Sequence, residues 1–246
     1  MSHKAEVIES IEVPEISPAT RKDFLPISSR SDRTVINPYV IRAKNIQEDN
    51  FIDFQNFDYS AYRKLLAFLS RYRSYVLEPT AGSGSFAINC AREKKTVGFI
   101  LIEKRFKRSV RALEKSKLLG LKNIFCLRGK FEDFVPFLPK NFFQVVYLAF
   151  PDPWMKEKWS QNRIYEEVKT LHDLVAHNGF LVLKTDQHHI INRIMVNFLG
   201  VLRIMALSFF YVEPRKCYRT DFEKMFLAKH IGVHALFMIK PCISIE

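Results

Sequence analysis

The sequence predicts an α/β fold in which a mostly parallel sheet is covered by helices on both faces. From residue 59 to residue 199, segments with the apolar periodicity of helices alternate with short apolar runs that are typical of buried strands. Residues 143–150 are apolar almost throughout, as expected for a parallel strand buried on both sides. With 246 residues, 48% of them hydrophobic, the chain is long enough to form one such domain.

The expected elements follow in a regular order. In the first helix, residues 59–73, apolar side chains such as Tyr62, Leu65 and Leu69 recur at helical spacing. Further helices are predicted at residues 85–92, 104–119, 164–176 and 188–199, and strands at residues 75–78, 96–102, 123–127, 143–150 and 180–184. A last pair of strands, at residues 203–212 and 233–239, brackets a helix that begins near Thr220.

The first 56 residues differ from the rest of the chain. They contain Pro14, Pro18, Pro26 and Pro38, many polar residues and no sustained periodicity. We therefore expect a flexible or irregular N-terminal arm at residues 1–56 and a single domain at residues 57–246. The basic residues of the arm would either contact RNA or keep the segment soluble, and the second is the simpler interpretation.

The charge of the chain points to a polyanionic partner. The formal net charge is +12, and 13% of the residues are aromatic, which would allow stacking on bases, although a basic surface can also serve solubility alone. No apolar stretch approaches the roughly 20 residues of a membrane span, and the N-terminus is polar, so we expect a cytoplasmic protein without membrane contact. The cysteines lack the spacing of metal ligands, so neither a metal site nor a disulfide framework is indicated; they are Cys90, Cys126, Cys217 and Cys242.

A glycine turn after the first predicted sheet strand suggests a cofactor site. Gly82 and Gly84 allow close approach of the backbone to a ligand, and with Glu103 at the end of the next strand they fit either NAD or S-adenosylmethionine. Glu78 separates the two, because its carboxylate would repel a pyrophosphate but favour the ammonium and sulfonium of S-adenosylmethionine. The alternatives are a solvated strand end for Glu78 and an ion pair with Lys104 or Arg105 for Glu103.

A Pro-Asp-Pro-Trp motif at residues 151–154 directly follows the apolar run 143–150. Asp152 would therefore lie at the edge of the sheet where α/β proteins bind ligands, with prolines restricting the backbone on both sides. Lys156, Lys158 and Arg163 follow and would hold phosphates, while Trp154 offers a stacking surface. A proline-rich surface turn is the alternative.

Taken in order, the motifs resemble the tRNA (guanine-N7)-methyltransferase family. The resemblance covers roughly residues 75–240; the motifs are the E-x-x-x-G-x-G turn at residues 78–84, GFILIE at residues 98–103, the Pro-Asp-Pro-Trp block with its basic run, Lys184-Thr185-Asp186 and Thr220-Asp221-Phe222-Glu223. It implies a Rossmann-like class I methyltransferase fold, with a seven-stranded, mostly parallel sheet and an antiparallel C-terminal strand. It also implies methyl transfer from S-adenosylmethionine to N7 of a guanine in tRNA.

The resemblance also implies roles for individual residues. Glu78, Gly82 and Gly84 would line the methionine end of the cofactor, Glu103 would bind its ribose, and Asp152 would lie at the catalytic centre beside the transferred methyl. Residues that would contact the target nucleoside or the RNA are Lys156, Lys158, Arg163, Asp186, Thr220 and Glu223. Asp186 and the Thr220-x-x-Glu223 pattern are also typical of helix caps, a role that is compatible with ligand binding.

Two positions depart from the family pattern. Thr80 stands where the family usually has a glycine, and Lys130 occupies the cofactor-binding position that is usually an acid beside the adenine. A lysine cannot accept a hydrogen bond from the adenine amino group, so backbone groups, Glu132 or Asp133 would have to do so. We expect these departures to affect cofactor affinity.

Guanine N7 has a free lone pair, so methylation there needs no prior deprotonation, and carboxylates suit the N–H donors of the guanine edge.

Two alternative functions remain open. Asp152-Pro153-Trp154 falls one proline short of the block of methyltransferases that act on exocyclic amines of adenine or guanine. The chain could also be a nucleic-acid-binding module with a degenerate cofactor site. Its oligomeric state is open.

Overall fold

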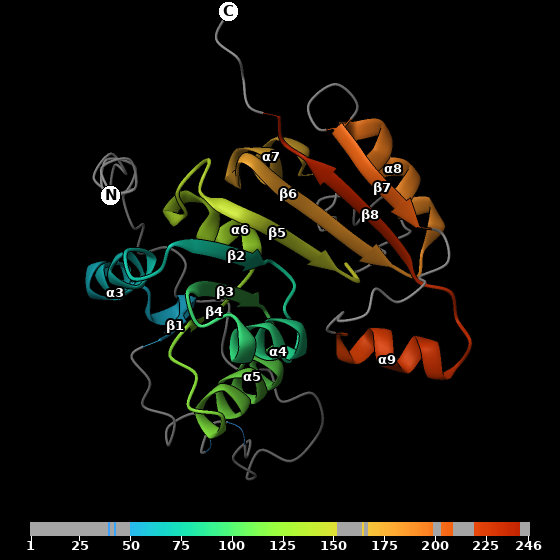
Figure 1. Ribbon diagram of the computed structural model, residues 1–246. Coiled ribbons are helices and arrows are strands. Elements are labelled where there is room, and N and C mark those ends of the chain that lie inside the picture. Colours follow the sequence, from blue (N-terminus) through green and yellow to red (C-terminus); the bar gives the residue numbers. More distant parts are fainter. Residues whose placement is uncertain are drawn as a thin grey trace, which may run out of the picture.

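The computed structural model describes residues 39, 42, 50–151, 164, 167–198, 203–208 and 219–241. Within these ranges the strands form one sheet with the order β1-β4-β3-β2-β5-β6-β8-β7 (Figure 1). The strands are β1 (Phe51–Asp53), β2 (Ser74–Glu78), β3 (Val97–Glu103), β4 (Ile124–Arg128), β5 (Phe143–Ala149), β6 (Val175–Thr185), β7 (Arg203–Ser208) and β8 (His234–Ile239). Strands β1 to β6 pair in parallel, whereas β8 runs antiparallel to both β6 and β7.

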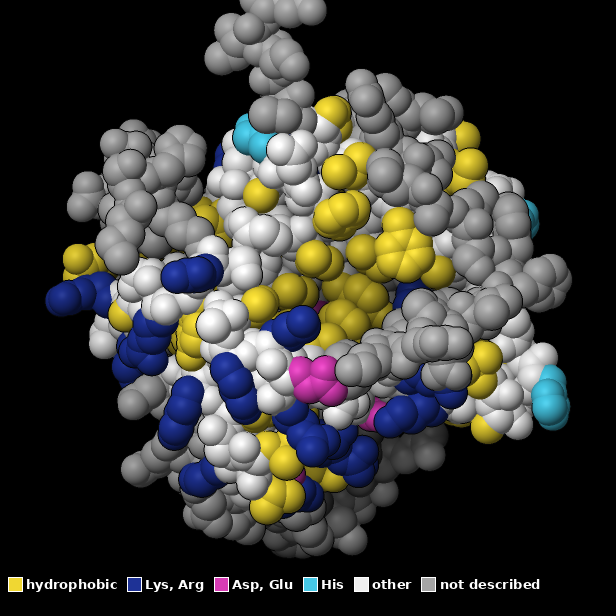
Figure 2. Space-filling model, viewed as in Figure 1, with side chains coloured by type: hydrophobic (Ala, Val, Ile, Leu, Met, Phe, Trp, Pro, Cys, Tyr) yellow, Lys and Arg dark blue, Asp and Glu magenta, His cyan; other side chains and the backbone are white. Residues whose placement is uncertain are grey.

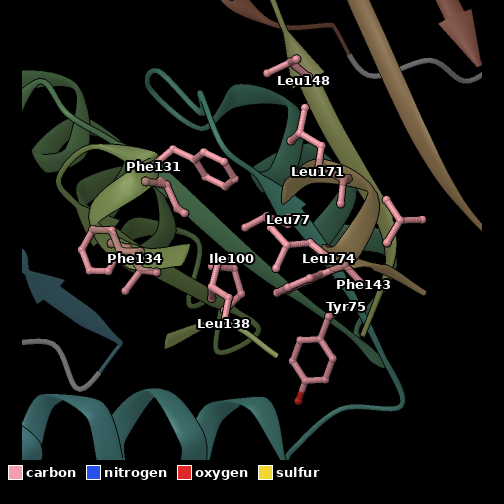
Figure 3. Close-up of a cluster of buried hydrophobic side chains, with 14 of the residues drawn as sticks. Tyr75, Leu77, Ile100, Phe131, Phe134, Leu138, Phe143, Leu148, Leu171 and Leu174 are labelled. Carbon is pink, nitrogen blue, oxygen red and sulfur yellow. The ribbon is translucent and has the colours of Figure 1, made fainter. Parts of the chain in front are cut away.

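Helices cover both faces of the sheet. They are α3 (Tyr59–Leu69), α4 (Ser85–Glu93), α5 (Phe106–Leu118), α6 (Phe131–Phe134), α7 (Val168–Leu174) and α8 (His188–Phe198). A further helix, α9 (Asp221–Ala228), precedes β8. Alternate residues of β3 point to opposite faces, because side chains alternate along a strand. Phe99 and Leu101 pack in the cluster formed by α4 and α5, while Ile100 belongs to the cluster that includes α3, α6, α7 and α8. Figure 3 shows the second cluster, in which side chains from β2, β3 and β5 meet those of α6 and α7.

The predicted architecture of a parallel sheet with helices on both faces and an antiparallel strand near the C-terminus is confirmed. The predicted helix at residues 164–176 is too long, because α7 ends at Leu174 and Val175 already pairs with Phe143 of β5. A β-branched residue such as Val175 suits a strand. The segment after β4 also forms the short helix α6 and the 3-10 turn η3 (Val135–Phe137), which the sequence pattern does not reveal.

The last residues of the expected arm take part in the sheet. Residues 51–56 form β1 and the 3-10 turn η2 (Phe54–Asn56), and β1 adds an eighth strand to the seven that were expected. The Arg128 guanidinium holds Asp53 at 2.6 Å in a largely buried ion pair. Within the arm, the described residues Tyr39 and Arg42 lie against α5, where Arg42 pairs with Glu114.

Parallel pairing brings the carboxyl ends of β2, β3, β4, β5 and β6 to one edge of the sheet. The direction in which successive strands are added to the sheet reverses at β2, since β3 and β4 lie on one side of β2 whereas β5 and β6 lie on the other. In open α/β sheets, this switch point is where ligands bind.

Among the helices that the structure describes, none combines the length and the apolar character that a membrane span requires.

Candidate active site

A cleft of about 530 Å³ lies at the carboxyl edge of the parallel strands. Its walls come from the ends of β2, β3 and β5, from the glycine turn after β2 and from α9. Figure 2 shows apolar side chains gathered in the middle of this face with Lys and Arg side chains beside them. The cleft therefore lies at the position where the topology predicts a ligand.

The glycine turn has backbone angles that glycine adopts more readily than other residues. Gly82 and Gly84 both have left-handed backbone angles, with φ of 59° and 70°. A Cβ atom on Gly84 would lie 2.7 Å from Leu101 Cδ2, so this glycine is required by the packing of the turn on β3. At Gly82 a Cβ atom would meet nothing within 4 Å, so this residue faces the open space of the cleft.

Glu78 lies at the floor of the cleft and is 1% exposed. The Ala87 N–H donates to its carboxyl group, but Oε2 makes no hydrogen bond within the part of the chain that the structure describes. Burial, with a smaller contribution from the charge of Glu103, raises the pKa of Glu78 well above its ordinary value. Glu78 is therefore not a solvated strand end, and a cationic ligand would satisfy its buried oxygen.

Glu103 lies at the end of β3, is 8% exposed and lines the same cleft. Its Oε1 accepts a hydrogen bond from the Arg105 backbone N–H at 2.7 Å, and the Gly82 N–H also donates to the carboxylate. Burial raises the pKa of Glu103, against the opposing effect of these hydrogen bonds and of the Arg108 charge. The carboxylate is thus held by backbone donors in an orientation suited to accepting hydroxyl hydrogen bonds.

The two departures from the family pattern have different surroundings. Thr80 Oγ1 donates to the Ala149 carbonyl at 3.1 Å, so the threonine ties the glycine turn to the end of β5. Lys130 is exposed at the rim of the cleft, and its backbone N–H donates to Asp133 Oδ2 at 2.9 Å. Glu132 lines the cleft, whereas Asp133 caps α6. Of the two acids considered as adenine acceptors, Glu132 is therefore the better placed.

The residues of the Thr220-x-x-Glu223 motif at the start of α9 lie partly in the cleft and partly in the interior. Thr220 lines the cleft, and its Oγ1 accepts a hydrogen bond from the Glu223 N–H at 3.1 Å, so the capping interpretation is confirmed. Glu223 is fully buried and its carboxylate accepts from Lys184 Nζ of β6 at 2.9 and 3.2 Å. Asp186 lines the cleft after β6. The structure thus brings Thr220 and Asp186 to the cleft and places Glu223 behind its wall.

The block predicted to be catalytic begins where the described residues end. Phe150 and Pro151 line the cleft, and the Phe150 N–H donates to the Lys184 carbonyl at 2.7 Å. Phe150 has a φ of 48°, an uncommon conformation for a bulky residue that precedes a proline. Predicted site residues that lie outside the described residues are Asp152, Lys156, Lys158 and Arg163.

An aromatic wall was not predicted from the sequence. Phe150 of the β5 end lies 5.3 Å from Phe226 and 6.2 Å from Phe222 of α9, measured between ring centroids, and all three line the cleft with Met225. The Arg108 guanidinium lies 5.1 Å from the Phe222 ring centroid. Phe222 and Phe226 stand one helical turn apart, and this spacing is the signal that was available in the sequence.

Three or more potential metal ligands of the types His, Cys, Asp and Glu do not cluster anywhere in the described ranges. The residues that line the cleft instead combine two buried carboxylates, a left-handed glycine turn, an aromatic wall and a basic rim. The basic rim comprises Lys104, Arg105, Arg108, Arg111 and Lys130. This combination suits two neighbouring ligands. One would carry a cationic part and hydroxyl groups, and the other would be planar and polyanionic.

Comparison with known proteins agrees with this description. Residues 72–229 match the methyltransferase family Methyltransf_4. The chain is 28% identical over 170 residues to a tRNA (guanine-N(7)-)-methyltransferase of Geobacillus kaustophilus, covering 67% of this chain and 78% of that protein. It is 34% identical over 161 residues to a bifunctional glycosyltransferase/methyltransferase of Fusobacterium nucleatum, covering 63% of this chain and 25% of the relative.

A third relative, a tRNA (guanine-N(7)-)-methyltransferase of Leptospira interrogans, is 33% identical over 121 residues, or 47% of this chain and 54% of that protein. The chain thus spans about a quarter and about half of the lengths of the Fusobacterium and Leptospira relatives.

Solved structures resemble this one in fold. The 16S rRNA methyltransferase KamB superimposes with a TM-score of 0.57 at 13% identity, covering 76% of this chain and 96% of that one. TrmN from Thermus thermophilus gives a TM-score of 0.52 at 18% identity, covering 73% and 48%. The predicted class I methyltransferase fold is confirmed, and the match over residues 72–229 establishes that the chain belongs to the Methyltransf_4 family of methyltransferases.

Proposed function

We propose that this protein transfers a methyl group from S-adenosylmethionine to N7 of a guanine in tRNA. The observation that carries the proposal is the buried Glu78 carboxylate, whose Oε2 has no hydrogen-bond partner among the described residues, beside the glycine turn of a methyltransferase fold. The similarity to tRNA (guanine-N(7)-)-methyltransferases and the Pro-Asp-Pro-Trp block support the choice of atom and RNA.

The residues of the cleft fit this cofactor. Glu78 would hold the ammonium of its methionine part, and Gly82 leaves room for that part beside the turn. Glu103 would accept hydrogen bonds from the ribose hydroxyls, while Glu132, which lines the same cleft, would accept from the adenine amino group. When bound, S-adenosylmethionine supplies a methyl group on a positively charged sulfur.

The aromatic residues that line the cleft suit a nucleobase. Phe150, Phe222 and Phe226 offer ring surfaces for stacking, which is worth about 1–3 kcal/mol per base. Asp186, which also lines the cleft, would accept hydrogen bonds from the N–H groups of a guanine edge. The basic rim would contact the RNA phosphates. A base must leave its stack to reach this cleft, so the target would be an exposed or flipped nucleotide.

For methylation at N7, the protein has to position the two reactants and stabilise the positive charge that forms on the base. The N7 lone pair would form the new N–C bond as the bond between the methyl carbon and sulfur breaks, and the sulfur would keep the electron pair of that bond in S-adenosylhomocysteine. No proton has to be removed, and the positive charge would pass from sulfur to the base. A carboxylate beside the base would stabilise this cation, and Asp152 is the residue we assign to that role. The assignment of Asp152 rests on the motif alone.

The direct test is to incubate the protein with labelled S-adenosylmethionine and tRNA and to identify the methylated nucleoside. We expect 7-methylguanosine, whose positive charge makes the RNA cleavable by borohydride and aniline. Asp152→Asn should lower turnover by about 10²–10³-fold and leave tRNA binding intact. Methylated exocyclic amines as the only product would instead support an amino-group methyltransferase, and tRNA binding without cofactor binding would support a binding module.

A further inference from the structure

The N-terminal end of α9 is tied to the glycine turn by a charged hydrogen-bond cluster. Ser85 Oγ donates to Asp221 Oδ1 at 2.7 Å, and Ser83 Oγ donates to Asp221 Oδ2. Lys115 Nζ of α5 donates to Ser85 Oγ at 3.0 Å and to Ser83 Oγ at 3.2 Å, and it lies 3.6 Å from Asp221. We call these four residues, Ser83, Ser85, Lys115 and Asp221, the latch.

The latch joins the two walls of the cleft. Ser83 and Ser85 flank Gly84 in the turn that we assign to the cofactor, whereas Asp221 begins the helix that carries Phe222 and Phe226 of the aromatic wall. Partial burial of Asp221 acts to raise its pKa, but hydrogen bonds from Ser83 and Ser85 and the Lys115 charge outweigh this and lower it. Asp221 is therefore ionised at neutral pH, and the hydrogen bonds of the latch are charge-assisted.

The ties of α9 differ in how easily they break. The side chains of Lys115 and Asp221 are 42% and 56% exposed, so water can replace the hydrogen bonds of the latch at low cost. The Glu223–Lys184 pair of the same helix is buried, and separating it would leave uncompensated charges in the interior. When α9 moves, the latch is therefore the tie that opens.

We propose that α9 is a lid over the S-adenosylmethionine cleft and that the latch holds the lid closed, which limits the rate at which the cofactor leaves. Asp221 is then a positioning residue that acts through α9. The proposal rests on the assigned cofactor site, but it is independent of which RNA base is methylated.

The test compares dissociation rates of S-adenosylhomocysteine, the product form of the cofactor, measured by displacement in a stopped-flow instrument. Asp221→Ala and Ser83→Ala should each raise the dissociation rate constant by about fivefold, and Asp221→Asn, which keeps one acceptor, by less. The dissociation rate constant of the Asp221→Ala/Ser83→Ala double variant should be only slightly higher than that of the faster single variant, because both changes remove the same contact. Lys117→Ala is the matched control, since Lys117 is an exposed lysine of α5 that lines neither the cleft nor the latch.

Hydrogen exchange in the cofactor-free protein gives a second readout. Amides of residues 221–228 should exchange faster in both single variants but not in Lys117→Ala. If Asp221 merely stabilised the start of its own helix, Ser83→Ala would leave exchange in α9 unchanged. A wild-type dissociation rate constant in Ser83→Ala, or additive effects in the double variant, would overturn the latch proposal. Either result would leave the assignment of the cofactor site standing. If the wild-type protein binds no S-adenosylhomocysteine, the proposed cofactor is the part that fails.

Discussion

Replacing Glu78 by Gln should stabilise the cofactor-free protein at neutral and alkaline pH while removing its cofactor binding. Glu78 is 1% exposed, and its Oε2 has no hydrogen-bond partner among the described residues. Gln has nearly the same shape and retains an acceptor for the Ala87 N–H, but it carries no charge. The substitution therefore isolates the free-energy cost of keeping a carboxylate in this position.

The pH dependence has a defined sign. Burial raises the pKa of Glu78 in the folded chain above its value in the unfolded chain, so the folded chain binds a proton more tightly. This contribution to stability is fully present below the unfolded pKa and is lost as the pH rises through the folded pKa. The loss proceeds at up to about 1.4 kcal/mol per pH unit, whereas the Gln variant lacks this titrating carboxyl group.

We therefore expect Glu78→Gln to match the wild type closely near pH 4 and to exceed it by about 1–3 kcal/mol at pH 8, the usual cost of an unsatisfied buried group. For a chain of this size, each kcal/mol corresponds to about 2–4 °C in Tm. The assay is thermal unfolding, followed by circular dichroism at several pH values, with and without S-adenosylhomocysteine. The ligand should raise the Tm of the wild type but not that of the variant.

Glu93→Gln is the control, because Glu93 is an exposed glutamate on α4 and its substitution should change stability by less than about 0.5 kcal/mol. A variant that is less stable than the wild type at pH 8, or a gain that is the same at every pH, would refute the assignment of a strained, buried carboxylate. Normal ligand stabilisation of Glu78→Gln would remove Glu78 from the cofactor site.

Three further predictions concern the other carboxylates and the basic run. Glu103→Ala should weaken S-adenosylmethionine binding by about 1.5–3 kcal/mol with the fold intact; unchanged affinity in calorimetry would exclude Glu103 from the site. Lys184→Met should destabilise the protein by about 3–5 kcal/mol in chemical unfolding because it leaves the Glu223 carboxylate buried and unpaired, and adding Glu223→Gln should recover much of the loss. Changing Lys158 and Arg163 together to Ala should reduce the log–log salt slope of tRNA binding by up to about 2 without affecting cofactor affinity; a wild-type slope would shift the RNA contact to the basic rim.

The sequence by itself determined the strands, the turn and the carboxylates of the cofactor half of the cleft. Apolar runs predict β3 and β5 because a buried parallel strand must be apolar on both faces. Gly82 and Gly84 predict a turn whose backbone can approach a ligand closely, because glycine has no Cβ atom. Glu78 and Glu103 end their strands, and parallel strands deliver their carboxyl ends to one edge of the sheet.

Only the tertiary structure decided how the remaining side chains are paired. β1 is a three-residue strand whose partner lies more than 70 residues further along the chain, so no local pattern marks it. Likewise, Glu223 meets Lys184 behind the wall of the cleft, and Asp221 meets two serines of the glycine turn, far away in the sequence. Local periodicity reports which face of an element is buried, but the partner of a polar group depends on how distant elements pack against each other.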